Sequence, residues 1–229
     1  TGATGGNIII GEIGGTSVET VTLDAGTGTT SVGVIGSGTE IGTLSIGSAE
    51  NGGITLNGAI TTDGVVTIDG PITLATAAIT ITTADDNINL QGTVDGGKAL
   101  TLASGSGAVN VDGAIGGSTA LTSLTVNSSG AGTVEINNIG TSSAAGVTGA
   151  TAIGNANTGT LTLDGTVYTT NAATYTAATG ENIGLTGAAT TTFTSSNDDV
   201  TFGTATVEMA NGSNLVIDTD TLGGTIDLT

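Results

Sequence analysis

The chain of 229 residues contains no cysteine, no histidine and no tryptophan, and its lysines and arginines together number one. Without imidazole, thiol or guanidinium groups it cannot build a Ser-His-Asp triad, a cysteine nucleophile or an arginine clamp. Aromatic residues make up 2% of the chain, so it lacks the ring platforms usual in sugar-binding clefts. These absences predict that the protein is not an enzyme. Glycoside hydrolysis, which needs only two carboxylates, is kept as an alternative.

Positive charge is almost absent. Twenty acidic residues face a single cation, Lys98, and the formal net charge is −19. DNA, RNA and anionic lipid surfaces all require a basic face, so the charge excludes nucleic acid as a partner. No apolar run approaches the roughly 20 residues that span a bilayer, and we expect no membrane insertion. Lys98 follows two glycines and is interpreted as a solvated surface lysine.

Acidic, glycine-rich and threonine-rich chains with so little lysine and arginine offer few cleavage sites to trypsin-like proteases. This composition predicts an extracellular or cell-surface location. The chain starts at Thr1 instead of methionine, as expected of a processed or excised chain. It is interpreted either as a complete subunit or as a fragment of a larger protein.

Short segments with apolar first and third residues and a middle residue that is usually polar recur along the chain. Alternate side chains of a strand point to opposite faces, so each triplet buries two side chains and exposes one. No segment sustains the apolar spacing of a helix. The triplets are 21–23, 44–46, 54–56, 72–74, 79–81, 88–90, 100–102, 109–111, 124–126, 134–136, 161–163, 183–185, 200–202, 207–209, 215–217 and 226–228.

Several triplets run into a repeated phrase that ends in Asp-Gly or Asn-Gly. Asp, Asn and Gly tolerate the left-handed backbone of a sharp turn, so the phrase predicts a corner after a short strand. The copies are 55–58 (TLNG), 67–70 (TIDG), 93–96 (TVDG), 110–113 (NVDG) and 162–165 (TLDG), with variants at 22–25 (TLDA) and 89–92 (NLQG).

Two architectures fit strands joined by corners every 7 to 12 residues or so. An antiparallel sandwich would use Asp-Gly in hairpins, but the triplets are short for it and its usual buried aromatic residues are missing. A parallel β-solenoid of about three short strands per coil fits better. We therefore predict an all-β parallel β-helix without helices of note. It forms one domain over residues 1–229, with a loop excursion or irregular coil at 139–160.

Two stretches resemble the repeats of large bacterial surface proteins of the filamentous-haemagglutinin and autotransporter-adhesin kind. One is 88–137, which begins INLQGTVDGGKALTLASGSGAVNVDG, and the other is 166–203, with YTT at 168–170, TYT at 174–176 and VTFG at 200–203. The resemblance implies a right-handed β-helix on a secreted or surface-held chain that serves as a stalk, adhesin or fibre. The secretion domain of that family is not recognisable in this sequence.

Clustered acids supply hard oxygen ligands of the kind that Ca²⁺ prefers. Carboxylates on successive coils about 4.8 Å apart would repel, and a bridging divalent ion would relieve that repulsion. The sequence indicates no required cofactor, and Ca²⁺ is the one metal that it suggests. The alternative interpretation is that these acids are solvated residues of surface turns. The candidate ligands are Asp85, Asp86, Asp198, Asp199, Asp218 and Asp220.

Apolar triplets lie close to both ends, with isoleucines at 8–10 and the triplet 226–228. Solenoids normally cover such ends with polar caps. Uncapped ends predict a homo-oligomer or homopolymer, a filament or stalk in which subunits stack head to tail. The alternative is an adhesin module that binds a glycan or a protein. Outward Thr-x-Thr at 20–22, 80–82 and 160–162 also suggests ice binding, although threonine is simply a good strand residue.

Overall fold

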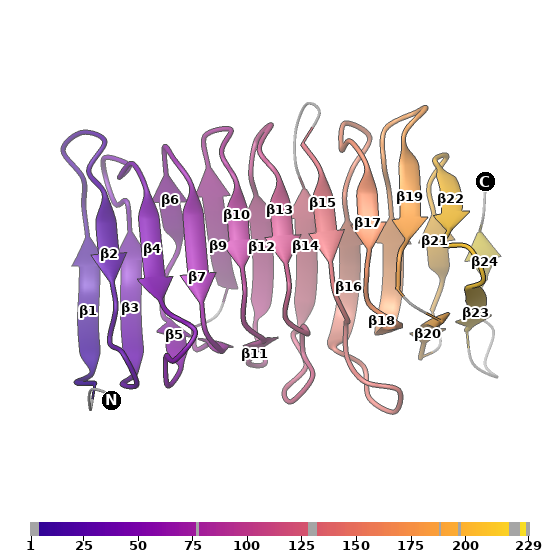
Figure 1. Cartoon of the computed structure of the whole chain (residues 1–229), viewed down its shortest axis with the longest axis horizontal. Helices are drawn as coiled ribbons and strands as arrows, with labels where there is room; N and C mark the ends of the chain where they lie inside the picture. Colours follow the sequence, from indigo (N-terminus) through magenta and orange to yellow (C-terminus); the bar gives the residue numbers. More distant parts are fainter. Residues whose placement is uncertain are drawn as a thin grey trace.

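The computed structural model describes residues 5–76, 78–127, 132–187, 189–196, 198–219 and 225–227. Within these residues the regular structure consists of strands alone, which make up about half of the chain, and every strand pair is parallel. Successive coils follow one another along the long axis, from β1 and β2 at the N-terminal end to β23 and β24 at the C-terminal end (Figure 1). The predicted all-β parallel solenoid is confirmed.

The strands lie on three faces. The nine-stranded sheet forms face 3, and the 15-stranded sheet bends to form faces 1 and 2. Face 3 contains β2 (Val21–Leu23), β4 (Leu44–Gly47), β7 (Val66–Asp69), β10 (Ile88–Leu90), β13 (Val109–Val111), β15 (Val134–Ile136), β17 (Leu161–Leu163), β19 (Asn182–Leu185) and β22 (Thr206–Met209).

Face 1 contains β5 (Ile54–Leu56), β8 (Ile72–Leu74), β11 (Val94–Asp95), β20 (Thr190–Ser195) and β23 (Asn214–Asp218). Face 2 contains β6 (Ile60–Thr62), β9 (Ala78–Thr83), β12 (Ala99–Ala103), β14 (Ser123–Asn127), β16 (Val147–Ile153), β21 (Val200–Phe202) and β24 (Ile226–Asp227). Three longer strands run across both faces: β1 (Ile8–Ile13), β3 (Thr30–Ile35) and β18 (Val167–Tyr175).

The strand register sets the length of a coil. Paired residues on face 3 lie between 21 positions apart, as in Ile88 with Val109, and 27 positions apart, as in Val134 with Leu161. The longest coil includes part of the segment 139–160, which was expected to loop out or to be irregular. There β16 places Val147 and Ile153 in the core, and both are fully buried.

Stacked coils arrange the core into columns of similar side chains. On face 3 the first residues of the triplets form one column and the third residues form another, while the middle residues face outward. Members of these columns inside the rod are at most 1% exposed. The first column is Val21, Leu44, Val66, Ile88, Val109, Val134, Leu161, Ile183 and Val207.

All four aromatic residues lie in the core of the last coils. Tyr168 stacks on Phe193 with ring centroids 4.9 Å apart, and Tyr175 stacks on Phe202 at 5.3 Å. Each of the four is at most 1% exposed. None of them therefore provides an exposed platform for a sugar ring.

The Asp-Gly phrases lie at corners, as predicted. Five of the seven copies end strands of face 3, and the copies at 55–58 and 93–96 end strands of face 1. The physical reason for most of the glycines differs from the one predicted, because only Gly70 and Gly96 in these copies have a positive φ. A Cβ on Gly92 would lie 2.0 Å from the carbonyl oxygen of Gly70, and one on Gly113 would lie 2.1 Å from that of Gly92. Glycine is required there because successive backbones touch.

Replacing Gly113 with alanine should destabilise the solenoid. The new Cβ would overlap the Gly92 carbonyl of the preceding coil, and relieving the overlap should lower the free energy of unfolding by about 1–3 kcal/mol. Urea unfolding monitored by circular dichroism measures the change. Gly97→Ala is the matched control, since a Cβ at Gly97 meets no atom within 4 Å. Equal unfolding midpoints for the two variants would contradict the proposed corner contact.

Candidate functional site

The first predicted calcium pair, Asp85 and Asp86, lies at the corner between β9 and β10. Asp85 has a φ of +108°, and its Oδ1 accepts a hydrogen bond of 2.8 Å from the backbone N–H of Ser106 on the next coil. The backbone carbonyl of Asp86 accepts a hydrogen bond from the Thr83 hydroxyl. The Asp85 carboxylate therefore helps to join two coils.

The second pair, Asp198 and Asp199, lies at the corner between β20 and β21, several coils away from the first. Asp198 Oδ2 accepts a hydrogen bond of 3.0 Å from Nδ2 of Asn171, and Asp199 Oδ1 accepts one of 2.8 Å from the backbone N–H of Thr225. The hydrogen bonds from Thr225 lower the pKa of Asp199 below its usual value. This pair also links neighbouring coils.

The remaining calcium candidates are Asp218, which is exposed at the end of β23, and Asp220, which lies outside the described residues. The fold does not bring the two acidic pairs together. Among the residues that the structure describes, no three Asp, Glu, His or Cys side chains are placed to hold one metal ion. Calcium binding stays a prediction that rests on pairs of carboxylates.

A different acidic group lies along face 3 and its corner. Asp112, Glu135 and Asp164 come from three consecutive coils, and we call them the acidic line. Burial, followed by the charges of Asp164 and Asp112, raises the pKa of Glu135 above its usual value. Burial, followed by the charge of Asp112, also raises the pKa of Asp164, although a backbone hydrogen bond opposes the shift.

The sequence contains a pattern that could have indicated the acidic line, although the line was not predicted. Asp112 and Asp164 occupy the same position in two copies of the Asp-Gly phrase, and Glu135 is the outward residue of a triplet. Glu135 pairs with Asn110 and with Thr162, so the register places Asp112 and Asp164 two positions further along the coils on either side of Glu135. The negative charges of the acidic line therefore repel one another in the folded protein.

Replacing Glu135 with glutamine should stabilise the protein at neutral pH. A carboxyl whose pKa is raised by folding binds its proton more tightly in the folded state, so stability falls as the pH rises from its unfolded value, 4.5, through its folded value. Above that window Glu135→Gln should gain about 0.5 kcal/mol by removing like-charge repulsion. Below pH 4.5 the gain should vanish. Thermal unfolding across this pH range measures it.

Glu19 supplies a control of opposite sign. Hydrogen bonds, the largest contribution coming from the Thr16 hydroxyl, lower the pKa of Glu19 from 4.5 to about 2. Its contribution to stability is present above pH 4.5 and is lost as the pH falls through about 2. Glu19→Gln should therefore destabilise the protein at neutral pH. The same pH profile for both variants would contradict the assignment.

Among the hollows on the surface of the described residues, three bear on function. One of about 460 Å³ lies near the N-terminal end and is lined by Val18, Thr39, Glu40 and Asp63, among others. A groove of about 330 Å³ runs over small residues of β16 and β18 on face 2, with Asp198 and Asp199 among its lining residues. The third, of about 290 Å³, lies at the C-terminal end.

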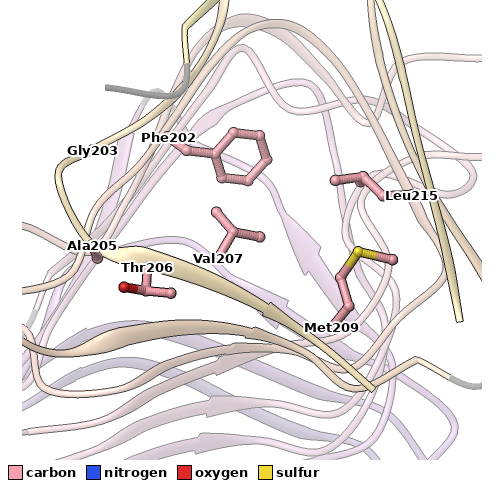
Figure 2. Close-up of a pocket in the computed structure, with 7 residues that line it drawn as sticks. All are labelled: Phe202, Gly203, Ala205, Thr206, Val207, Met209 and Leu215. Carbon is pink, nitrogen blue, oxygen red and sulfur yellow. The ribbon is translucent and has the colours of Figure 1, made fainter. Parts of the chain in front are cut away.

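The C-terminal hollow is the most apolar of the three. The side chains of Phe202, Val207, Met209 and Leu215 surround a common space inside the open end of the coil (Figure 2). Met209 is 43% exposed, although it belongs to a core column whose inner members are buried. This end of the core is a candidate site for contact with another chain.

The Thr-x-Thr motifs do not form one surface. The motifs at 20–22 and 160–162 lie on face 3, while the motif at 80–82 lies on face 2. On face 3 the outward column between Thr22 and Thr162 is interrupted by Asn89, Asn110 and Glu135. Ice binding gains no support from this arrangement.

Comparison of the chain with protein-family models, with curated proteins and with solved structures gave no match. The resemblance to bacterial surface repeats therefore stays a prediction. The described part of the chain contains no helix of the length and apolar character needed to cross a membrane.

Proposed function

We propose that this protein is a structural, extracellular β-solenoid subunit that stacks head to tail into a filament or stalk, and that it has no enzymatic activity. The observation that carries the proposal is the exposure of core side chains at the two ends of the described rod. Inside the rod the side chains of the core columns are buried, but near the C-terminal end the side chain of Met209 is 43% exposed and that of Ile226 is 47% exposed. At the other end Ile8, Ile10 and Ile13 of β1 are only half-buried.

Stacking of β1 of one copy on β23 and β24 of another would cover Ile226 and the isoleucines of β1. The first and last coils present different surfaces, so the contact is heterologous, and a heterologous contact that does not close into a ring produces an open fibre. Exposed strand edges supply backbone hydrogen bonds for the same contact. The composition and the resemblance to bacterial surface repeats support a location outside the cell.

Charge opposes this assembly. Each subunit carries a net charge of −19, and subunits repel one another unless salt screens them, over about 8 Å at physiological ionic strength. We therefore expect filament length to increase with salt concentration. Apolar contacts at the joint should hold the subunits together once repulsion is screened.

The proposal is tested with the purified 229-residue chain by analytical ultracentrifugation and electron microscopy. We expect filaments one solenoid wide whose length increases with protein and salt concentration. Ile10→Lys should abolish them, because it places a charge in the N-terminal joint, while Thr101→Lys on the side of the rod should not. Uniform monomers at high protein concentration in both low and high salt would contradict the proposal.

A further inference from the structure

Face 2 is uncharged over most of its length. Seven successive strand positions on this face are occupied by β6, β9, β12, β14, β16, the part of β18 that pairs with β16, and β21, and none of these strands contains a charged residue. In Figure 1 the strands β9, β12, β14 and β16 follow one another behind the strands of face 3. We call the outward surface of these seven strands the neutral patch.

The outward side chains of the neutral patch are short. On β12 and β14 they are those of alanine, serine, threonine and asparagine, because leucine and valine occupy the inward positions. The strand register places the middle outward residues in one column, which contains five threonines and one alanine: Thr80, Thr101, Thr125, Ala152, Thr174 and Thr201.

Face 3, by contrast, is acidic. Four aspartates lie at or directly after the ends of its strands, and two glutamates are middle residues of its triplets. They are Asp24, Asp69, Asp112, Asp164, Glu135 and Glu208. Two copies of a chain with a net charge of −19 would therefore repel one another strongly if they met through face 3, and a basic partner would be attracted to that face and not to face 2.

Charged residues near the neutral patch lie around it and not on it. Asp63, Asp85 and Asp199 lie at corners next to β6, β9 and β21, and Lys98 directly precedes β12. The groove of about 330 Å³ over β16 and β18 lies toward the C-terminal end of the patch, with Asp199 among its lining residues. The neutral patch therefore allows two copies to approach with their carboxylates at or beyond the edge of the contact.

The neutral patch is large enough for a specific contact. Seven strands with a spacing of about 4.8 Å, each about five residues long with a rise of about 3.3 Å per residue, cover about 34 Å by about 16 Å. Two copies that meet across this area would bury about 1,100 Å² in total, which is near the lower limit of specific interfaces. The contact between two single subunits is therefore weak.

A second copy of the chain fits the neutral patch in two respects. A threonine hydroxyl both donates and accepts a hydrogen bond, so a threonine column can bond to an identical column, whereas carboxylates only accept. The outward side chains also repeat every 4.8 Å or so along the rod, and an identical rod has the same repeat. Short side chains of one copy can therefore lie between those of the other, as in paired β-sheets with interdigitated side chains.

We propose that two copies of this chain pair side by side through their neutral patches. The contact is isologous, with a two-fold axis that lies in the plane between the two faces, so both copies contribute the same residues. The contact area is largest when this axis passes through the centre of the patch. Thr125, the middle residue of the middle strand β14, then lies opposite Thr125 of the second copy.

This pairing goes beyond the head-to-tail contact of the proposed filament and does not depend on it, because it uses a side of the rod and not its ends. In a filament one solenoid wide the neutral patch recurs once in each subunit. Weak contacts that recur along two filaments reinforce one another. Such filaments should therefore pair at protein concentrations higher than those at which they first form.

Sedimentation equilibrium of the Ile10→Lys chain, in which the N-terminal joint is blocked, tests the pairing without filaments. We expect a monomer–dimer equilibrium at protein concentrations up to about 1 mM, and more dimer as salt screens the net charge. Thr125→Glu should weaken the dimer at least about tenfold, because it places two like charges opposite each other. Thr67→Glu is the matched control, since it adds the same charge at an outward threonine of β7 on face 3 and should leave the dimer unchanged.

Chemical cross-linking locates the contact on the rod. The chain has no cysteine, so a bis-maleimide linker that spans about 10 Å, the distance between packed sheets, reacts only at an introduced thiol. Thr125→Cys should give covalent dimers at protein concentrations at which Thr67→Cys stays monomeric. Neither cysteine variant adds a formal charge, so the result does not depend on how Thr125→Glu folds.

Three results would overturn the pairing: a chain that stays monomeric over this concentration range, equal effects of Thr125→Glu and Thr67→Glu, or equal cross-linking of the two cysteine variants. Dimers of the unaltered chain that never extend into filaments would contradict the proposed filament alone. Filaments that stay single, formed by a chain that fails these tests of pairing, would contradict the pairing alone.

Discussion

Backbone hydrogen bonds between successive coils hold the strands at the spacing of a β-ladder, about 4.8 Å, along the whole rod. Bonds such as the one of 2.9 Å from Asp112 N–H to the carbonyl oxygen of Leu90 repeat at the corners as well as on the faces. At Gly92 and Gly113 this spacing leaves no room for a side chain, because a Cβ there would overlap a carbonyl group of the preceding coil. The glycines at these two positions therefore follow from the strand spacing.

The same spacing places like residues on like. On the inner side it produces columns of valine, isoleucine and leucine, which give way to stacked aromatic rings at Tyr168 and Phe193. On the outer side it also brings carboxyl groups of successive coils near one another, as in the acidic line of Asp112, Glu135 and Asp164. No further described coil covers the last residues of these columns, so side chains such as Met209 are exposed there.

Much of this architecture could be predicted from the sequence. Each of the predicted triplets falls within a strand wherever the structure describes it, because alternation of apolar and polar residues directly records one buried face. No triplet was predicted within β18 or β20, which are rich in threonine and alanine. Their inward threonines, including Thr170 and Thr191, are at most 1% exposed and do not follow the simple pattern.

The candidate sites were harder to predict, because they depend on which coils lie next to one another. The calcium candidates were chosen by proximity in sequence, and the fold uses Asp85 and Asp199 to bind the backbone of adjacent coils.

In-register stacking of coils is the central claim of this account, and a distance between two outward residues of face 3 tests it most directly. Thr22 and Thr162 are separated by six strand steps, which correspond to about 29 Å. The chain has no cysteine, so spin labels can be attached specifically to a Thr22→Cys, Thr162→Cys variant and the distance measured by pulsed electron resonance. The account predicts one narrow distribution near that value, and a broad distribution or one centred far from it would contradict the stacking.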